Sequence, residues 1–179
     1  MMSVTVFLAD DHAVLREGLR LLLSSEPEIE VVGEAANGRE AVERVPECYP
    51  DVVIMDIAMP EMNGIEAARQ IADLCPDTRV LVLSMYSSSE HILRALEAGV
   101  RGYLLKESVG TEVVSAIHAV CAGRFYMGRK IAHLMSEQQV RAAHMASTAM
   151  QALSAVKAPV SAAASEPEPA LYSMAAMLE

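Results

Sequence analysis

The chain of 179 residues has few aromatic, basic and cysteine side chains. It contains no Trp, and aromatic residues make up only 4% of the sequence, so any core must be built from aliphatic side chains. Its three cysteines, Cys48, Cys75 and Cys121, lie far apart and form no CxxC pair, which excludes a disulfide framework or a cysteine zinc site and is typical of a reducing cytosol. No run of about 20 apolar residues is present to span a bilayer. The first apolar run is interrupted by Asp10 and Asp11, unlike a signal peptide. We therefore expect a cytoplasmic chain with no membrane partner.

Positive charge is also scarce, since 14 Lys and Arg stand against 24 Asp and Glu, giving a net charge of −10. The whole excess of acid lies in residues 1–125, because residues 126–179 carry four acids and four bases. Affinity for nucleic acid depends largely on phosphate neutralisation by Lys and Arg. This charge balance argues against a polyanion as the main partner. The hydrophobic content of 53% is nevertheless sufficient for a folded core.

Two periodicities alternate along the first 125 residues. Short apolar, β-branched runs are typical of buried strands, and they occur at 4–9, 31–35, 52–55, 80–83 and 102–105. Apolar residues at helical spacing predict intervening helices around 15–23, 41–45, 65–74, 92–96 and 113–121. We expect Gly99 to end the fourth of these helices. Five β–α repeats with short connections predict an α/β fold with a doubly wound parallel sheet.

Polar side chains follow four of the five predicted strands. Asp10 and Asp11 follow the first strand, Asp56 the third, Ser84 the fourth and Lys106 the fifth. Right-handed crossovers place the carboxyl ends of parallel strands at one edge of the sheet, where ligands bind. Taken singly, each residue could be a helix cap, a turn residue or a solvated charge. Their shared position at one edge favours a common pocket.

The chemistry of this pocket requires a cation. Two carboxylates about 4–5 Å apart repel each other by roughly 3–4 kcal/mol at an effective dielectric constant near 20, so three cannot all stay ionised unaided. A few carboxylate oxygens with room for water and phosphate oxygens are suited to Mg²⁺. Lys106 is the only lysine in residues 1–125, and its compact ammonium is suited to a single phosphoryl oxygen. The arrangement predicts a carboxylate that accepts a phosphoryl group.

These motifs together resemble the receiver domain of bacterial two-component response regulators. The resemblance is strengthened by Met59-Pro60 and Gly64 after Asp56, and by Tyr103 three residues before Lys106. The segments 81–85 and 94–106 are similar to those of the NarL/FixJ (LuxR-type) subfamily. The resemblance implies that residues 1–125 form a flavodoxin-like receiver with strand order 2-1-3-4-5.

The resemblance also implies a role for each motif residue. Asp56 is the phosphoacceptor, supplied by the phosphohistidine of a sensor histidine kinase, and Lys106 contacts the phosphoryl oxygen. The Mg²⁺ ligands are Asp10, Asp11, Asp56 and the backbone carbonyl of Ala58. On phosphorylation, Ser84 moves to the phosphate and Tyr103 turns inward. Such a chain is no multi-turnover enzyme, and its phosphorylation favours a homodimer.

Residues 126–179 depart from the subfamily, which normally ends in a DNA-binding helix-turn-helix. Their weak apolar pattern predicts a helix over 136–157, and their composition predicts a Pro-rich linker over 158–169. Residues 136–179 carry only Arg141 and Lys157 as strong bases and show no paired-helix pattern. We therefore do not expect this chain alone to bind DNA. The alternative is a DNA-binding transcriptional regulator that acts through an unrecognised effector region or by dimerising with a full-length relative.

Two other classes with related chemistry fit the residues less well. A haloacid dehalogenase-type phosphatase needs an acid two residues after its nucleophile, where this chain has Ala58. A flavodoxin that binds FMN needs a phosphate loop after the first strand, where Asp10 and Asp11 would repel phosphate. Met85 follows Ser84 where many receivers have a smaller residue. We hypothesise that Met85 restricts the approach of water to the acyl phosphate.

Overall fold

The computed structural model describes residues 3–135, together with Met145 and Ala149. The predicted helix over 136–157 and the predicted linker over 158–169 therefore lie outside the described residues, apart from those two positions. Within the described part, no helix has both the length and the apolar character needed to cross a membrane.

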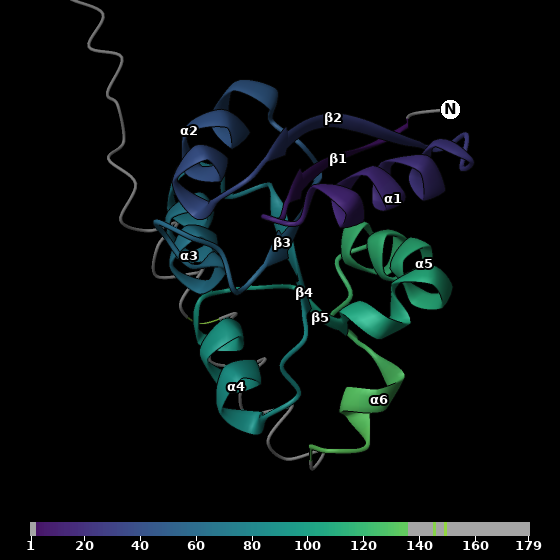
Figure 1. Cartoon of the computed structure of the whole chain (residues 1–179). Coiled ribbons are helices and arrows are strands. Elements are labelled where there is room, and N and C mark those ends of the chain that lie inside the picture. Colours follow the sequence, from purple (N-terminus) through teal and green to yellow (C-terminus); the bar gives the residue numbers. More distant parts are fainter. Residues whose placement is uncertain (1–2, 136–144, 146–148, 150–179) are drawn as a thin grey trace, which may run out of the picture.

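A single parallel sheet of six strands forms the centre of the fold (Figure 1). The strands are β1 (Val4–Ala9), β2 (Ile29–Ala35), β3 (Val52–Asp56), β4 (Arg79–Ser84), β5 (Gly102–Leu105) and β6 (Tyr126–Met127). Their order is β2-β1-β3-β4-β5-β6, which confirms the predicted doubly wound topology and the order of the five predicted strands. The sixth strand was not predicted, because two residues are too few to show a strand periodicity.

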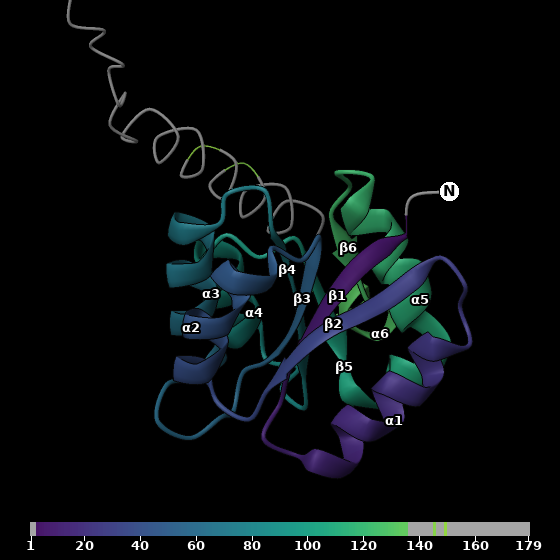
Figure 2. The ribbon, with the colours of Figure 1, turned by 90° about the horizontal axis from the view of Figure 1, so that it is seen from above.

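Helices cover both faces of this sheet. They are α1 (Ala13–Ser24), α2 (Gly38–Cys48), α3 (Gly64–Leu74), α4 (Ser89–Glu97), α5 (Val109–Cys121) and α6 (Arg129–Ala132), with a 3₁₀ turn at Lys106–Ser108. Figure 2 shows α1 and α5 on one face and α2, α3 and α4 on the other. Gly99 follows α4 with a φ of +90°, which confirms the predicted end of that helix.

Three helices begin at a polar side chain that satisfies a free backbone donor. The side chains of Asn37, Asn63 and Ser88 each accept a hydrogen bond from the backbone N–H three residues later, at the starts of α2, α3 and α4. Asn63 also determines where the loop after Asp56 ends and α3 begins.

The strands alternate between two apolar cores. In β1, Phe7 and Ala9 belong to the cluster beneath α2, α3 and α4, whereas Val6 and Leu8 belong to the cluster beneath α1 and α5. All four are at most 1% exposed, as expected for a parallel sheet buried on both faces. The cores are predominantly aliphatic and closely packed, so they hold the ends of the strands in fixed positions.

Residues 126–135 continue the fold along the free edge of β5. Ile131 and Met135 are buried in the cluster beneath α4. The buried carboxylate of Glu112 accepts hydrogen bonds from the Tyr126 hydroxyl at 2.8 Å and from the Arg129 backbone N–H at 3.1 Å. Burial, and then the neighbouring Glu112, raise the pKa of Tyr126 to about 12. Glu112 thus anchors β6 and the start of α6 to α5.

Gly64 lets α3 approach the end of β3. A Cβ atom at Gly64 would lie 1.8 Å from the backbone oxygen of Asp56, a distance that no packed structure tolerates. The Gly64 N–H also donates to the Ile57 carbonyl at 2.9 Å. The glycine therefore holds the backbone of Asp56 against the first turn of α3.

Gly64→Ala should destabilise the fold by about 1–3 kcal/mol, because the extra methyl group pushes α3 away from Asp56. Urea unfolding measures the change. The matched control is Gly18→Ala in α1, where a Cβ meets nothing within 4 Å. The control should stabilise the chain by about 0.5–1 kcal/mol, because alanine favours the helix. Equal effects of the two substitutions would contradict this account.

Candidate functional site at the carboxyl edge of the sheet

Lys106 lies between two buried carboxylates. Its Nζ is 2.7 Å from Asp10 Oδ2 and donates a hydrogen bond to Asp56 Oδ2 at 2.9 Å. The lysine side chain is 9% exposed, while Asp10 and Asp56 are 4% and 2% exposed. The ends of β1, β3 and β5 therefore meet at one point, where sequence reasoning placed them.

Asp11 and His12 complete the cluster on the side nearer to solvent. The side chain of Asp11 is 32% exposed, and its Oδ1 lies 2.9 Å from His12 Nδ1. Four side chains each offer one possible ligand atom here, and these four atoms all lie within 4.8 Å of one another. The residues are Asp10, Asp11, His12 and Asp56. Asp11 does not cap α1, because the N-cap residue is His12. The capping explanation of Asp11 is therefore wrong.

The electrostatics of the cluster favour an additional cation. Burial raises the pKa of Asp56 above its ordinary value, and the charge of Asp10 adds to this, although the hydrogen bond from Lys106 opposes it. Burial alone would lower the pKa of Lys106, but the contacts with Asp10 and Asp56 outweigh it and raise that pKa. One ammonium thus neutralises only part of the carboxylate charge.

The residues present fit a divalent metal ion such as Mg²⁺. Asp10 Oδ2 is buried and lies 2.7 Å from Lys106 Nζ, which also contacts Asp56. A single ammonium between buried carboxylates leaves negative charge that a further cation can offset. Oxygen ligands from Asp10, Asp11 and Asp56 are those that Mg²⁺ prefers.

The loop after β3 shapes the side of the site that faces Asp56. The backbone N–H of Ala58 donates to Asp56 Oδ1 at 3.3 Å, so both carboxylate oxygens of Asp56 have a donor. Glu61 adopts a left-handed conformation with φ +64° and lets the loop return to α3. The role of the Ala58 carbonyl as a metal ligand stays a prediction.

Ser84 and Tyr103 lie beside the cluster and are both fully buried. Ser84 Oγ accepts a hydrogen bond from the Tyr86 backbone N–H at 3.0 Å, and the Tyr103 hydroxyl donates to the Tyr86 carbonyl at 2.8 Å. Tyr103 is thus buried and bonded to Tyr86 in this structure, and its turn on phosphorylation stays a prediction. Both side chains contact the same peptide segment after β4.

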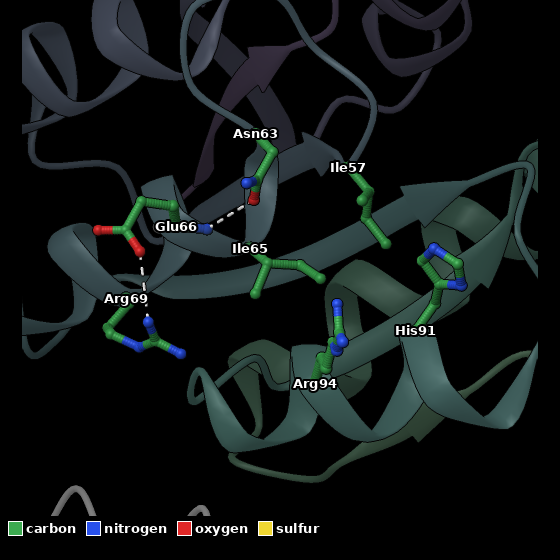
Figure 3. A pocket seen from close by; sticks show the side chains of 7 residues that line it. All are labelled: Ile57, Asn63, Ile65, Glu66, Arg69, His91 and Arg94. Carbon is green, nitrogen blue, oxygen red and sulfur yellow. Dashed lines mark hydrogen bonds and ion pairs between the residues drawn. The ribbon is translucent and has the colours of Figure 1, made fainter.

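The surface around the described part of the sheet edge is hollowed at more than one place. The smaller, about 180 Å³, is lined by Ser84, Met85, Ser87, Leu105, Lys106 and Glu107 and thus adjoins the charged cluster. The larger, about 320 Å³, lies between α3 and α4 and has none of the clustered carboxylates in its lining. Figure 3 shows Arg94 and His91 on its α4 side and the Glu66–Arg69 ion pair on its α3 side. The smaller hollow is therefore the one that shares Lys106 with the charged cluster.

Sequence reasoning missed two residues of this site. His12 was not considered as a ligand, although it directly follows Asp10 and Asp11. Arg16 donates a hydrogen bond to the Asp10 carbonyl at 2.6 Å and forms an ion pair with Glu34 at 3.3 Å. The only sequence signal for Arg16 is its place one helical turn after His12.

The fold and the position of this site at the carboxyl edge of the sheet are typical of a receiver domain. Residues 6–118 match the model of the response regulator receiver domain. The chain belongs to that family.

Known proteins similar to this chain agree with the assignment. The DNA-binding transcriptional activator DevR/DosR of Mycobacterium tuberculosis is 45% identical over 129 residues, which cover 72% of this chain and 59% of the activator. A crystal structure of a LuxR-family two-component response regulator from Aurantimonas sp. SI85-9A1 is 40% identical, with a TM-score of 0.73, covering 77% of this chain and 99% of that one. A chain in the crystal structure of the CheX–CheY–BeF₃–Mg²⁺ complex from Borrelia burgdorferi is 26% identical, with a TM-score of 0.63. The match covers 66% of this chain and 90% of that one.

The chain spans about half to three fifths of the length of the curated relatives it matches. These relatives are transcriptional regulators, which supports the resemblance to the NarL/FixJ and LuxR-type subfamily.

The raised pKa of Asp56 predicts a pH-dependent effect of Asp56→Asn on stability. Because the folded state favours the protonated acid, wild-type stability falls as pH rises from the ordinary pKa of 3.8 through the raised one. In metal-free buffer the variant should therefore be more stable than wild type above this window, and the difference should vanish below it. Each 1 kcal/mol of difference in the free energy of unfolding corresponds to a melting-temperature change of about 2–5 °C.

Melting temperatures measured between acidic and neutral pH in EDTA test this prediction. Asp77→Asn is the control, because Asp77 is exposed at the opposite edge of the sheet. If Asp56→Asn melts at a lower temperature than wild type at neutral pH, the contact of the Asp56 carboxylate with Lys106 stabilises the fold by more than burial of that carboxylate destabilises it.

Proposed function

We propose that this chain is a phosphoacceptor whose Asp56 takes a phosphoryl group from a sensor histidine kinase in a Mg²⁺-dependent reaction. The observation that carries the proposal is the placement of Lys106 between Asp10 and Asp56 at the edge of the sheet. Family membership supports it independently.

Asp56 acts as the nucleophile. One carboxylate oxygen forms the new O–P bond while the bond from phosphorus to the donor imidazole nitrogen breaks, and the electron pair of that bond returns to the donor. Lys106 and the Ala58 N–H already contact the two oxygens of Asp56. Lys106 is also placed to neutralise an oxygen of the arriving phosphoryl group.

Asp10, Asp11 and Asp56 would hold Mg²⁺, with the Ala58 carbonyl as a further ligand. When bound, the ion supplies positive charge that offsets the carboxylates and the phosphoryl oxygens. The similar Borrelia burgdorferi complex contains Mg²⁺ and BeF₃, which supports the same cation here. The excess of carboxylate charge around the single ammonium of Lys106 supports it from this structure.

Ser84 and Tyr103 would transmit the change. Ser84 Oγ accepts a hydrogen bond from the Tyr86 N–H, so rotation toward a phosphoryl oxygen exchanges one donor–acceptor pair for another. Tyr103 is linked to the same residue through the Tyr86 carbonyl. The segment from Ser84 to α4 is therefore the element that phosphorylation shifts. The output face is α4, β5 and α5.

The partners follow from this proposal. They are a histidine kinase as donor and a second copy of the chain in a homodimer that phosphorylation favours. DevR/DosR is a DNA-binding activator, but this chain spans 59% of its length. We therefore do not extend DNA binding to this chain.

Incubation with acetyl phosphate and Mg²⁺ should add the mass of one phosphoryl group to the intact protein. Asp56→Asn should abolish the adduct, because it replaces the nucleophilic carboxylate, and EDTA should prevent it in wild type. Intact-protein mass spectrometry measures both. Asp77→Asn is again the control and should retain the adduct. An adduct of equal yield in Asp56→Asn would reject Asp56 as the acceptor.

Met85→Ala should shorten the lifetime of the phosphorylated state several-fold. Met85 is 74% exposed and lines the hollow that contains Ser84 and Lys106. A shorter side chain therefore opens a path for water to the acyl phosphate. The decay of the mass adduct after removal of acetyl phosphate gives the rate, with Leu134→Ala as an exposed apolar control. An unchanged lifetime would contradict the proposed role of Met85.

A further inference from the structure

The hollow between α3 and α4 has the size of a small-molecule site. Its volume of about 320 Å³ falls within the range of pockets that hold small ligands, which often lie between helices. The lining combines an apolar part, Ile57 and Ile65, with polar side chains from both helices. The phosphoacceptor chemistry proposed above uses none of these side chains.

The polar part of this lining carries an excess of positive charge, although the chain as a whole has a net charge of −10. Arg69 of α3 and Arg94 of α4 stand against one carboxylate, that of Glu66. Figure 3 shows Arg94 and His91 on the α4 side and Arg69 on the α3 side. An anion in the hollow is therefore bordered by guanidinium groups of both helices.

The ion pairs that these arginines form are exposed. Arg69 pairs with Glu66 at 3.3 Å and Arg94 with Glu90 at 2.8 Å, each along its own helix. The two arginine side chains are 54% and 65% exposed, and exposed pairs of this kind contribute little to stability. An arriving anion can therefore replace either carboxylate at small cost.

His91 offers a ring that is already fixed in place. Its Nδ1 lies 2.6 Å from Ser88 Oγ, and the ring stacks on that of Tyr86 with centroids 4.5 Å apart and an interplanar angle of 8°. The ring is therefore ordered before a ligand arrives, which lowers the entropic cost of binding.

The hollow is connected to the phosphoacceptor at two points. Ile57 directly follows Asp56 in the chain and lines the hollow. Tyr86, on which His91 stacks, contacts both Ser84 and Tyr103 through its backbone. A ligand that shifts Ile57 or His91 therefore acts on residues next to the proposed switch.

We propose that this hollow is an effector site for a small organic phosphate. Arg69, Arg94 and His91 bind the anion, because the planar guanidinium group matches the geometry of phosphate oxygens, and an apolar group of the ligand packs on Ile57 and Ile65. Binding does not depend on the proposed function, whereas its coupling to phosphorylation rests on it. The coupling is reciprocal, so the ligand and the phosphoryl group change each other's stability on the protein.

Phenylphosphonate is the probe, because it joins an anion to an apolar ring and its C–P bond cannot supply a phosphoryl group to Asp56. The full chain is titrated in EDTA, where the carboxylates of the charged cluster repel the probe, and heteronuclear NMR locates the bound site. The signals of Ile57, Ile65 and His91 should shift. Methylphosphonate, which lacks the ring, should bind about tenfold more weakly.

Arg94→Gln should weaken the binding of phenylphosphonate about tenfold, because one charge-assisted contact is lost. Arg20→Gln is the matched control and should bind as wild type does. The Arg20 side chain is likewise exposed and pairs with a carboxylate of its own helix, Glu17, but it lies on α1. Equal affinity of the two variants, or shifts confined to other residues, would overturn the site.

The lifetime of the phosphoryl adduct tests the coupling. After removal of acetyl phosphate, phenylphosphonate at its wild-type Kd should change the lifetime at least twofold in wild type and in Arg20→Gln, but not in Arg94→Gln. A lifetime that does not change in wild type, or changes equally in Arg94→Gln, would overturn the effector role. If no adduct forms at all, the proposed function fails, and the titration still decides whether the site exists.

Discussion

The ion pairs of Lys106 with Asp10 and Asp56 are the interaction on which the rest of the site depends. Each of the three side chains is at least nine-tenths buried, so none can be solvated in place of its partners. Removing the ammonium of Lys106 would leave two buried carboxylates without their counter-charge, which is far more costly than losing an exposed pair. The positions of β1, β3 and β5 are thereby tied together at their carboxyl ends. The same arrangement leaves two buried carboxylates against one ammonium, and this imbalance of charge makes the site suited to a cation.

Most of the fold could be predicted because parallel strands buried on both faces have a clear sequence signature. The runs around Val4–Ala9 and Val80–Leu83 are apolar and β-branched, and they alternate with helical spacing. The meeting of the polar residues that follow these strands could be predicted from topology alone, since the carboxyl ends of such strands lie at one edge of the sheet. The strand β6 could not be predicted, because its pairing depends on Glu112 and on the free edge of β5 rather than on a local pattern.

The details of the site were harder to obtain from sequence, for a physical reason. Which oxygen contacts which donor depends on side-chain conformation, and a one-dimensional pattern does not carry this information. His12 shows the difficulty, since a histidine at a helix start has several ordinary roles, and its ring direction is decided by Asp10 and Asp11. Tyr103 shows it as well, because its hydroxyl donates a hydrogen bond to the Tyr86 carbonyl, a contact that no local pattern signals. The aromatic ring of Tyr86 in turn stacks on His91 of α4 at 4.5 Å, so the site and the helix are in direct contact.

The short strand β6 also changes how the domain would behave if it were cut. Its pairing covers the outer backbone of β5, and Ile131 and Met135 fill the apolar cluster behind it. A protease that cleaved near Gly123 and released the following residues would expose a buried strand edge together with an apolar patch. Exposed strand edges are templates for pairing between chains. A fragment ending at residue 125 would therefore be prone to aggregate even though every residue of the charged cluster is retained.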